Sequence, residues 1–248
     1  MMSFSAHLIL YTLMITAAVG IGSCLSIFFG RSQHQMHFIL ALSAGLMLGA
    51  ALIHLLPSSF ELMGKSASVW VLVGFLFLYV IKKYLTIHIC ELLECENHLM
   101  GFGAFVGISI HALTDGIALG SGLMVEGLGF VVFLTIFFHK LPEAFALTRV
   151  LVHEKFSWTK IVLLNILLML MVPLGAYLVD MLVGMHDVHH YAGLALALSA
   201  GTFLHIALSD LLPHVHEHAE KHSPIYIAFV LGTGFMWALS LMEKFVSL

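Results

Sequence analysis

Apolar stretches of about twenty residues recur along the whole chain, and short polar segments separate them. A helix that crosses the hydrocarbon core of a bilayer needs about 20 mainly apolar residues. The chain is 60% hydrophobic and only 10% charged, whereas soluble domains carry roughly 25% charged residues. We therefore exclude a water-soluble globule and predict an all-α, polytopic membrane helix bundle that forms a single transmembrane domain over residues 1–248. Eight spans are expected, near 7–29, 36–56, 68–85, 100–123, 128–150, 158–182, 190–212 and 224–246.

Basic residues indicate how the chain is threaded, because cytoplasmic loops collect Lys and Arg. The first span has no basic residue before it and no small-residue cleavage site after it, so we expect it to remain as a helix. With the N-terminus outside, only Lys65 and Lys244 fall on the outer side. Both termini are therefore expected on the non-cytoplasmic side of the cell (plasma or inner) membrane, with an internal membrane as the alternative. The inner side receives Arg31, Lys82, Lys83, Arg149, Lys155, Lys160 and Lys221.

Two segments of the chain repeat one another. Residues 42–61 read LSAGLMLGAALIHLLPSSFE and residues 198–217 read LSAGTFLHIALSDLLPHVHE, with eleven of the twenty aligned positions identical. Under the expected topology the two copies run in opposite directions, and inverted repeats of this kind are typical of secondary transporters. We expect helices 1–3 and 6–8 to be the repeats, around helices 4 and 5. The alternative is a chance similarity between two small-residue packing faces.

Ionisable residues lie in the middle of the fourth and fifth spans, where each costs roughly 2.5–3.5 kcal/mol on insertion scales. His111 and Asp115 are four residues apart, and so are His139 and Glu143. This spacing places each pair on one helical face. Two imidazoles and two carboxylates suit tetrahedral zinc at ligand distances of about 2.0–2.2 Å. The alternative is two buried histidine–carboxylate hydrogen bonds that only hold the bundle together.

Two further features accompany these four residues. Pro142 lies inside the fifth span and is expected to kink it beside the ligands, because its ring clashes with the carbonyl of Phe138. Glycines in the fourth span offer a small surface on which a neighbouring backbone can come close enough for both helices to share one ion; simple packing is the alternative. These glycines are Gly116, Gly120 and Gly122.

Together these residues resemble the motifs of the ZIP (Zrt/Irt-like) family of metal transporters. The LSAG…LLP pattern of the second and seventh spans is also similar, so the resemblance covers most of the chain. It implies eight helices, outward-facing termini, a homodimer, and uptake of Zn²⁺ or a related ion (Fe²⁺, Mn²⁺ or Cd²⁺) into the cytoplasm. It also implies an elevator-type movement in which helices 1, 4, 5 and 6 slide against helices 2, 3, 7 and 8. The matching residues are His111, Asp115, Gly116, Ala118 and Gly120 in the fourth span, and His139, Pro142 and Glu143 in the fifth.

The chain departs from the family's two-metal pattern at two positions. Many members resemble an arrangement with Asn directly after the fourth-helix histidine and an acid directly after the fifth-helix histidine, where this chain has Ala112 and Lys140. Ala112 offers no ligand, and an ammonium group has no lone pair and repels a second cation. We therefore expect a single metal site, in which Lys140 replaces the missing cation and balances Asp115 and Glu143. The alternative is that Lys140 extends to the inner surface.

Other polar residues are secondary candidates. His54 and Asp210 hold equivalent positions in the two repeats and are expected either to cap helix ends or to line the metal path. His205 and Asn165 lie inside apolar spans, where a hydrogen-bonded packing role is favoured over a role as ligands. Two inner loops are rich in metal-binding residues that can bind or sense metal loosely, and incidental residues of solvated loops are the alternative. The loop residues are Cys90 and Cys95, and His214, His216, His218 and His222.

Zn²⁺ is therefore expected as a transported substrate. The expected partners are the divalent ion, the lipid bilayer and a second copy of the chain, with no nucleic acid. An intramembrane zinc-dependent hydrolase is the first alternative, but the usual His–Glu–x–x–His signature is absent. A bis-histidine haem protein is the second, and Asp115 and Glu143 beside the histidines argue against it. We do not expect an enzyme.

Overall fold

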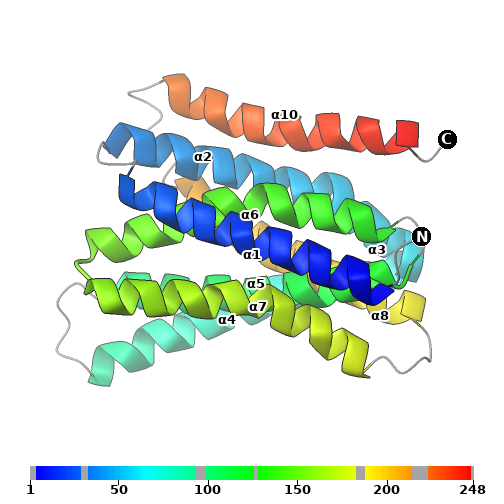
Figure 1. Ribbon diagram of the computed structural model, residues 1–248, viewed down its shortest axis with the longest axis horizontal. Coiled ribbons are helices and arrows are strands. Elements are labelled where there is room, and N and C mark those ends of the chain that lie inside the picture. Colours follow the sequence, from blue (N-terminus) through cyan, green and yellow to red (C-terminus); the bar gives the residue numbers. More distant parts are fainter. Residues whose placement is uncertain are drawn as a thin grey trace.

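The structure, a computed structural model, describes residues 4–28, 33–92, 99–125, 128–182, 188–213 and 223–246, and this part of the chain is helices and turns without strands. The long helices lie nearly along one axis (Figure 1). They are α1 (Phe4–Phe28), α2 (Gln33–Gly49), α4 (Ala67–Leu92), α5 (Leu99–Leu123), α6 (Leu128–His153), α7 (Trp158–Leu182), α8 (Val188–His205) and α10 (Ser223–Val246). Four short segments complete the description: η1 (Ala50–Leu55), α3 (Leu56–Met63), η2 (Gly64–Ser66) and η3 (Ile206–Leu211).

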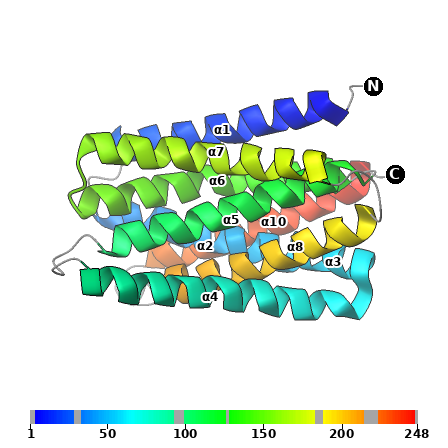
Figure 2. The ribbon, with the colours of Figure 1, turned by 90° about the horizontal axis from the view of Figure 1, so that it is seen from below.

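Seven described segments are long and apolar enough to cross a membrane. One of them, His37–Tyr84, has 48 residues, which is more than twice the length that one crossing needs. Within it the chain reverses between α3 and α4 (Figure 2), at Gly64, whose φ of 60° lies in the region that favours glycine. Large apolar side chains are exposed along the helices, as expected of a lipid-facing surface. Examples are Leu13, Val69, Leu163 and Val230. The chain is a multi-pass membrane protein.

Each repeated segment contains a π-helical turn at the same place. In η1 the N–H of Leu56 donates to the carbonyl of Ala51, and in η3 the N–H of Leu212 donates to the carbonyl of Ala207. A proline lies two residues beyond the end of each turn, at positions 57 and 213. Proline has no N–H for the usual i to i−4 bond and its ring clashes with that carbonyl, so the helix widens just before it. The helices that carry the two turns, α2 and α8, run in opposite directions along the bundle (Figure 2).

The long helices pack in two matching sets of pairs. Helix α2 packs along α10 and α4 along α8, while α1 packs along α6 and α5 along α7. Glycines allow the close approach within all four pairs: a Cβ atom at Gly45, Gly201, Gly22 or Gly116 would collide with a carbonyl oxygen of α10, α4, α6 or α7, respectively. The expected role of the α5 glycines is therefore wrong in one respect. Gly116 and Gly120 face α7, and only Gly122 faces α6, at Val132.

This packing places α5 and α6 side by side inside the bundle. Helix α5 contacts α6, α7 and α8, while α6 contacts α1, α2 and α5. Helix α6 continues through Pro142 to His153. The first turn of α1 and the last turn of α10 lie at the same end of the bundle (Figures 1 and 2). The central part of α5 and α6 is thus screened from lipid by the other helices.

Candidate metal centre

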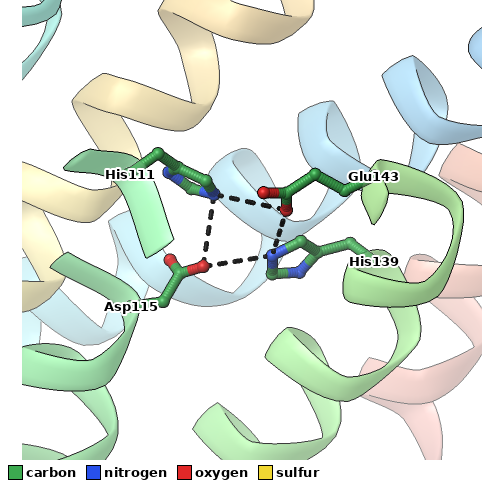
Figure 3. Close-up of side chains that lie close together, drawn as sticks. All are labelled: His111, Asp115, His139 and Glu143. Carbon is green, nitrogen blue, oxygen red and sulfur yellow. Dashed lines mark hydrogen bonds and ion pairs between the residues drawn. The ribbon is translucent and has the colours of Figure 1, made fainter. Parts of the chain in front are cut away.

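Four side chains that the sequence singles out meet between α5 and α6. His111 and Asp115 come from α5, and His139 and Glu143 come from α6 (Figure 3). One ligand atom from each lies within 4.8 Å of the other three. All four residues are at most 3% exposed. Among the described residues, this is the group of three or more His, Cys, Asp or Glu side chains that lie close enough together to hold a metal ion.

The spacing of the four ligand atoms suits one small cation. Asp115 Oδ2 lies 3.2 Å from His111 Nε2 and 3.3 Å from His139 Nε2. Glu143 Oε2 lies 3.9 Å and 3.6 Å from the same two nitrogen atoms. A tetrahedral ion with ligands at about 2.0 Å separates those ligands by about 3.3 Å. The cluster therefore needs only small adjustments to surround a zinc-sized ion.

Both imidazoles present a lone pair to the centre of the cluster. His139 Nδ1 lies 2.7 Å from the carbonyl oxygen of Thr135, which only accepts hydrogen bonds, so Nδ1 carries the proton. His111 Nδ1 lies 3.0 Å from Thr202 Oγ1, and that hydroxyl donates to the carbonyl of Ser199 at 2.9 Å. Thr202 Oγ1 therefore accepts from His111. In the neutral imidazoles both Nε2 atoms are then acceptors that face carboxylate oxygens, which is unfavourable unless a cation lies between them.

Lys140 is buried beside this cluster instead of extending to the membrane surface. It is 1% exposed, and its Nζ atom lies 2.8 Å from Asp115 Oδ2 and 2.8 Å from Glu143 Oε2. These are the same two oxygen atoms that face the imidazoles. Ala112, the other departure from the two-metal pattern, is fully buried and adds no ligand. The cluster thus combines two acids, two imidazoles and one fixed ammonium group.

Comparison with known proteins decides the family. A model described as "ZIP Zinc transporter" matches residues 93–240, which is more than half of the 248 residues. The chain belongs to the ZIP family. The resemblance of the fourth-span and fifth-span motifs is therefore confirmed, and the buried cluster of this ZIP protein fits a role in metal transport.

Several known proteins are similar to this chain. An uncharacterized protein of Methanocaldococcus jannaschii is 30% identical over 195 residues, which cover 75% of this chain and 78% of the relative. Zinc transporter ZIP9 of Micropogonias undulatus is 27% identical over 178 residues, which cover 66% of this chain and 57% of the relative. Zinc transporter ZIP10 of Danio rerio is 28% identical over 153 residues, which cover 58% and 18%. The chain thus spans 57% or less of the length of these two zinc transporters.

A second polar group of this ZIP protein lies further along α8. His205 is 3% exposed, and its Nδ1 atom makes no hydrogen bond within the described residues. Asp210 in η3 forms an ion pair with Lys82 of α4. At the equivalent position of the first repeat, His54 Nε2 donates to the carbonyl of Met236 in α10, at 2.9 Å. None of these residues joins the four-residue cluster.

Asn165 occupies a different place, between α1, α6 and α7. Its Oδ1 atom accepts from Ser23 at 2.7 Å and from Thr148 at 3.0 Å. Its Nδ2 atom donates to the carbonyl of Ile161 at 2.9 Å. Both ends of the amide are therefore engaged, which favours the packing role over a role as a metal ligand.

The side chains of the loop candidates lie outside the described part of the chain. His214, His216, His218, His222 and Cys95 lie outside the described residues. Helix α4 extends to Leu92 and includes the backbone of Cys90, which was expected in a loop; its side chain is also outside the described part. Ser199 and Thr202, in contrast, contact the cluster although they were not predicted there from the sequence. Their three-residue spacing in the second LSAG segment is the one sequence signal that places them on a common face.

Proposed function

We propose that this protein carries Zn²⁺ through the bilayer into the cytoplasm by way of the site formed by His111, Asp115, His139 and Glu143. The observation that carries the proposal is the inward arrangement of two imidazole lone pairs and two carboxylate oxygens around one buried point. Mixed nitrogen and oxygen ligands bind borderline ions such as zinc without the permanence of a thiolate cage. The ZIP9 and ZIP10 relatives are named as zinc transporters, and Fe²⁺, Mn²⁺ and Cd²⁺ are secondary substrates in this proposal.

The site takes one ion at a time. A second cation next to the first would need further acids, but the two acids of the cluster already contact the ammonium group of Lys140. Ala112 gives no additional ligand at the neighbouring position. Like charges a few ångströms apart in a poorly solvated interior repel strongly. Lys140 therefore takes the part of the second ion.

The fold of the proposed transporter has eight crossings and an inverted repeat. The long segment 37–84 supplies two crossings, because the chain reverses between α3 and α4. The first repeat comprises α1, the segment from α2 to α3, and α4; the second comprises α7, α8 with η3, and α10. Three observations support the repeat: the matching π turns, the opposite directions of α2 and α8, and the matched helix pairs. Substrate sites of such transporters lie between the repeats, near the bilayer midplane.

Transport uses an elevator-type movement in this proposal. Helices α1, α5, α6 and α7 form the moving body and carry all four ligands, while α2, α4, α8 and α10 form the stationary body. Asn165 and its partners hold α1, α6 and α7 together, and α5 packs on α7 through Gly116. The pairs of α2 with α10 and of α4 with α8 give the stationary body its own close packing. A homodimer would hold that body in the membrane.

The path continues along α8 toward the cytoplasm. The excess of seven basic residues on one side over two on the other favours the inner side for the end of α8. His205 and Asp210 follow the site in that direction, and His54 holds the equivalent position toward the outer side. In this proposal the protein lies in the cell membrane, and both termini are on its non-cytoplasmic side. The loop histidines and cysteines are a secondary acceptor for the released ion.

Zinc uptake into proteoliposomes tests the proposal, with wild type compared with His111→Ala and Glu143→Ala. We expect wild-type flux that both substitutions reduce strongly, and one bound zinc per wild-type chain. Undiminished flux in both variants would refute the site. Two bound ions per chain would refute the single-site arrangement, and the absence of flux of every divalent metal in folded wild type would favour the hydrolase.

A further inference from the structure

We propose that Thr202 and Ser199 of α8 are positioning residues for the metal site, so that zinc affinity depends on how α5 lies against α8. The inference rests on the proposed function. It adds a reason why the ion is held in one position of the moving body and released in another. Neither residue reaches the centre of the cluster. Each forms a hydrogen bond with the ligand atom that does not face the centre, His111 Nδ1 or Asp115 Oδ1.

Thr202 fixes the proton of His111. Its hydroxyl donates to the carbonyl of Ser199 and can therefore only accept from His111 Nδ1, at 3.0 Å. The imidazole is thereby held with its Nε2 lone pair toward the cluster. Without this acceptor, a neutral His111 is free to carry its proton on Nε2, which then cannot bind a metal.

Ser199 acts on the second α5 ligand. Its hydroxyl donates to Asp115 Oδ1 at 2.9 Å. This bond leaves Oδ2, the oxygen that faces both imidazoles, directed into the site. Thr202 and Ser199 are each 1% exposed, so water does not replace these bonds in the present arrangement.

The two hydroxyl groups come from the body that does not carry the ligands. A slide of α5 along α8 by one helical turn, about 5.4 Å, takes His111 and Asp115 away from Thr202 and Ser199. The first repeat has no equivalent acceptor for His111, because the position equivalent to Thr202 is Leu46. The hydrogen bond that orients His139 stays within its own helix, since His139 donates to the carbonyl of Thr135 in α6. The movement therefore weakens one half of the site and leaves the other half intact.

Direct zinc binding to the purified full-length protein is the first test. Thr202→Val keeps the size of the side chain and removes the acceptor, and we expect the Kd for zinc to rise by roughly 10–100-fold, as for other groups that orient metal ligands. Thr202→Ser should restore an affinity near that of wild type, and Ser199→Ala should weaken binding in the same direction. Thr12→Val and Ser59→Ala, at buried positions whose hydroxyl groups donate to carbonyls within α1 and α3, are matched controls that should leave Kd unchanged.

The second test asks whether the effect depends on the position of α5. Zinc exchange is measured in proteoliposomes from the outer and the inner face separately. We expect Thr202→Val to raise the half-saturating concentration on one face only. An equal rise on both faces would overturn the dependence on position, and wild-type affinity in Thr202→Val and Ser199→Ala would overturn the positioning role. Failure of the proposed function looks different, because His111→Ala would then bind and carry zinc like wild type.

Discussion

Lys140 donates hydrogen bonds to both carboxylate oxygens of Glu143, at 3.0 Å and 2.8 Å, from three residues earlier on the same helix. The pair is buried, and the same ammonium group also contacts Asp115. A buried charge of this kind is tolerated only where its partners are in place. Lys140 thus stabilises the two buried carboxylates, and in the proposed transporter it would compete with a bound ion for them.

Replacing Lys140 should separate these two roles. In Lys140→Met we expect the free energy of unfolding of the zinc-free protein to fall by about 3–5 kcal/mol, because two buried carboxylates lose their cation. Zinc should bind more tightly, on the order of tenfold or more, since a positive charge next to the site is removed. Denaturant unfolding with and without zinc, together with calorimetric titration, measures both effects. Lys65→Met, at an exposed lysine, is the control. Weaker zinc binding in Lys140→Met would contradict this account.

The close approach of α5 to α7 predicts a sharp difference between two glycines. A Cβ atom at Gly116 meets the backbone of Val172 and Ala176, whereas a Cβ atom at Gly234 meets nothing within 4 Å. Gly116→Ala should therefore lower the free energy of unfolding by about 1–3 kcal/mol, the usual effect of overpacking, while Gly234→Ala should not lower it. Unfolding in detergent compares the two. Equal stability of both variants would show that the helices can separate freely.

The packing role of Asn165 predicts a loss of stability without a loss of metal binding. Asn165→Leu removes the hydrogen bonds with Ser23 and Thr148 while keeping the same number of side-chain heavy atoms and the same branching. We expect the free energy of unfolding to fall by roughly 1–2 kcal/mol, as for other hydrogen bonds between membrane helices. Calorimetric titration should give the wild-type zinc affinity. A large drop in that affinity would make Asn165 part of the metal site after all.

The ion pair between Asp210 and Lys82 predicts a change in rate rather than in affinity. If Asp210 lies on the path, Asp210→Asn should slow zinc flux severalfold at saturating zinc, because a metal-binding oxygen along the path is lost. The Kd of the central site should stay the same, since Asp210 does not contact it. Glu61→Gln, at an exposed carboxylate of α3, is the matched control. Unchanged flux in Asp210→Asn would assign the ion pair to helix anchoring alone.

The four residues of the cluster could be predicted from sequence because helical periodicity places residues four apart on one face. The buried state of Lys140 followed from its position in the middle of an apolar span. Thr202 could not be found in the same way: its partner His111 is distant in the sequence, and a threonine among small residues has the pattern of simple packing. The α5 glycines show the same limit. Their sequence indicates a close helix contact, but only the three-dimensional packing shows that the contacted helix is α7 and not α6.

The widened turns in η1 and η3 change which way the two ends of each helix face. One additional residue in a helical turn rotates everything after it by about 100° relative to a regular α-helix. Ser199 and Thr202, which precede η3, can therefore face α5, while Asp210 at its end is directed to Lys82 of α4. The same offset in η1 sets His54 toward α10. Residues before and after each turn thus contact two different neighbouring helices within one helical segment, and removing one residue from either turn would misalign the half beyond it.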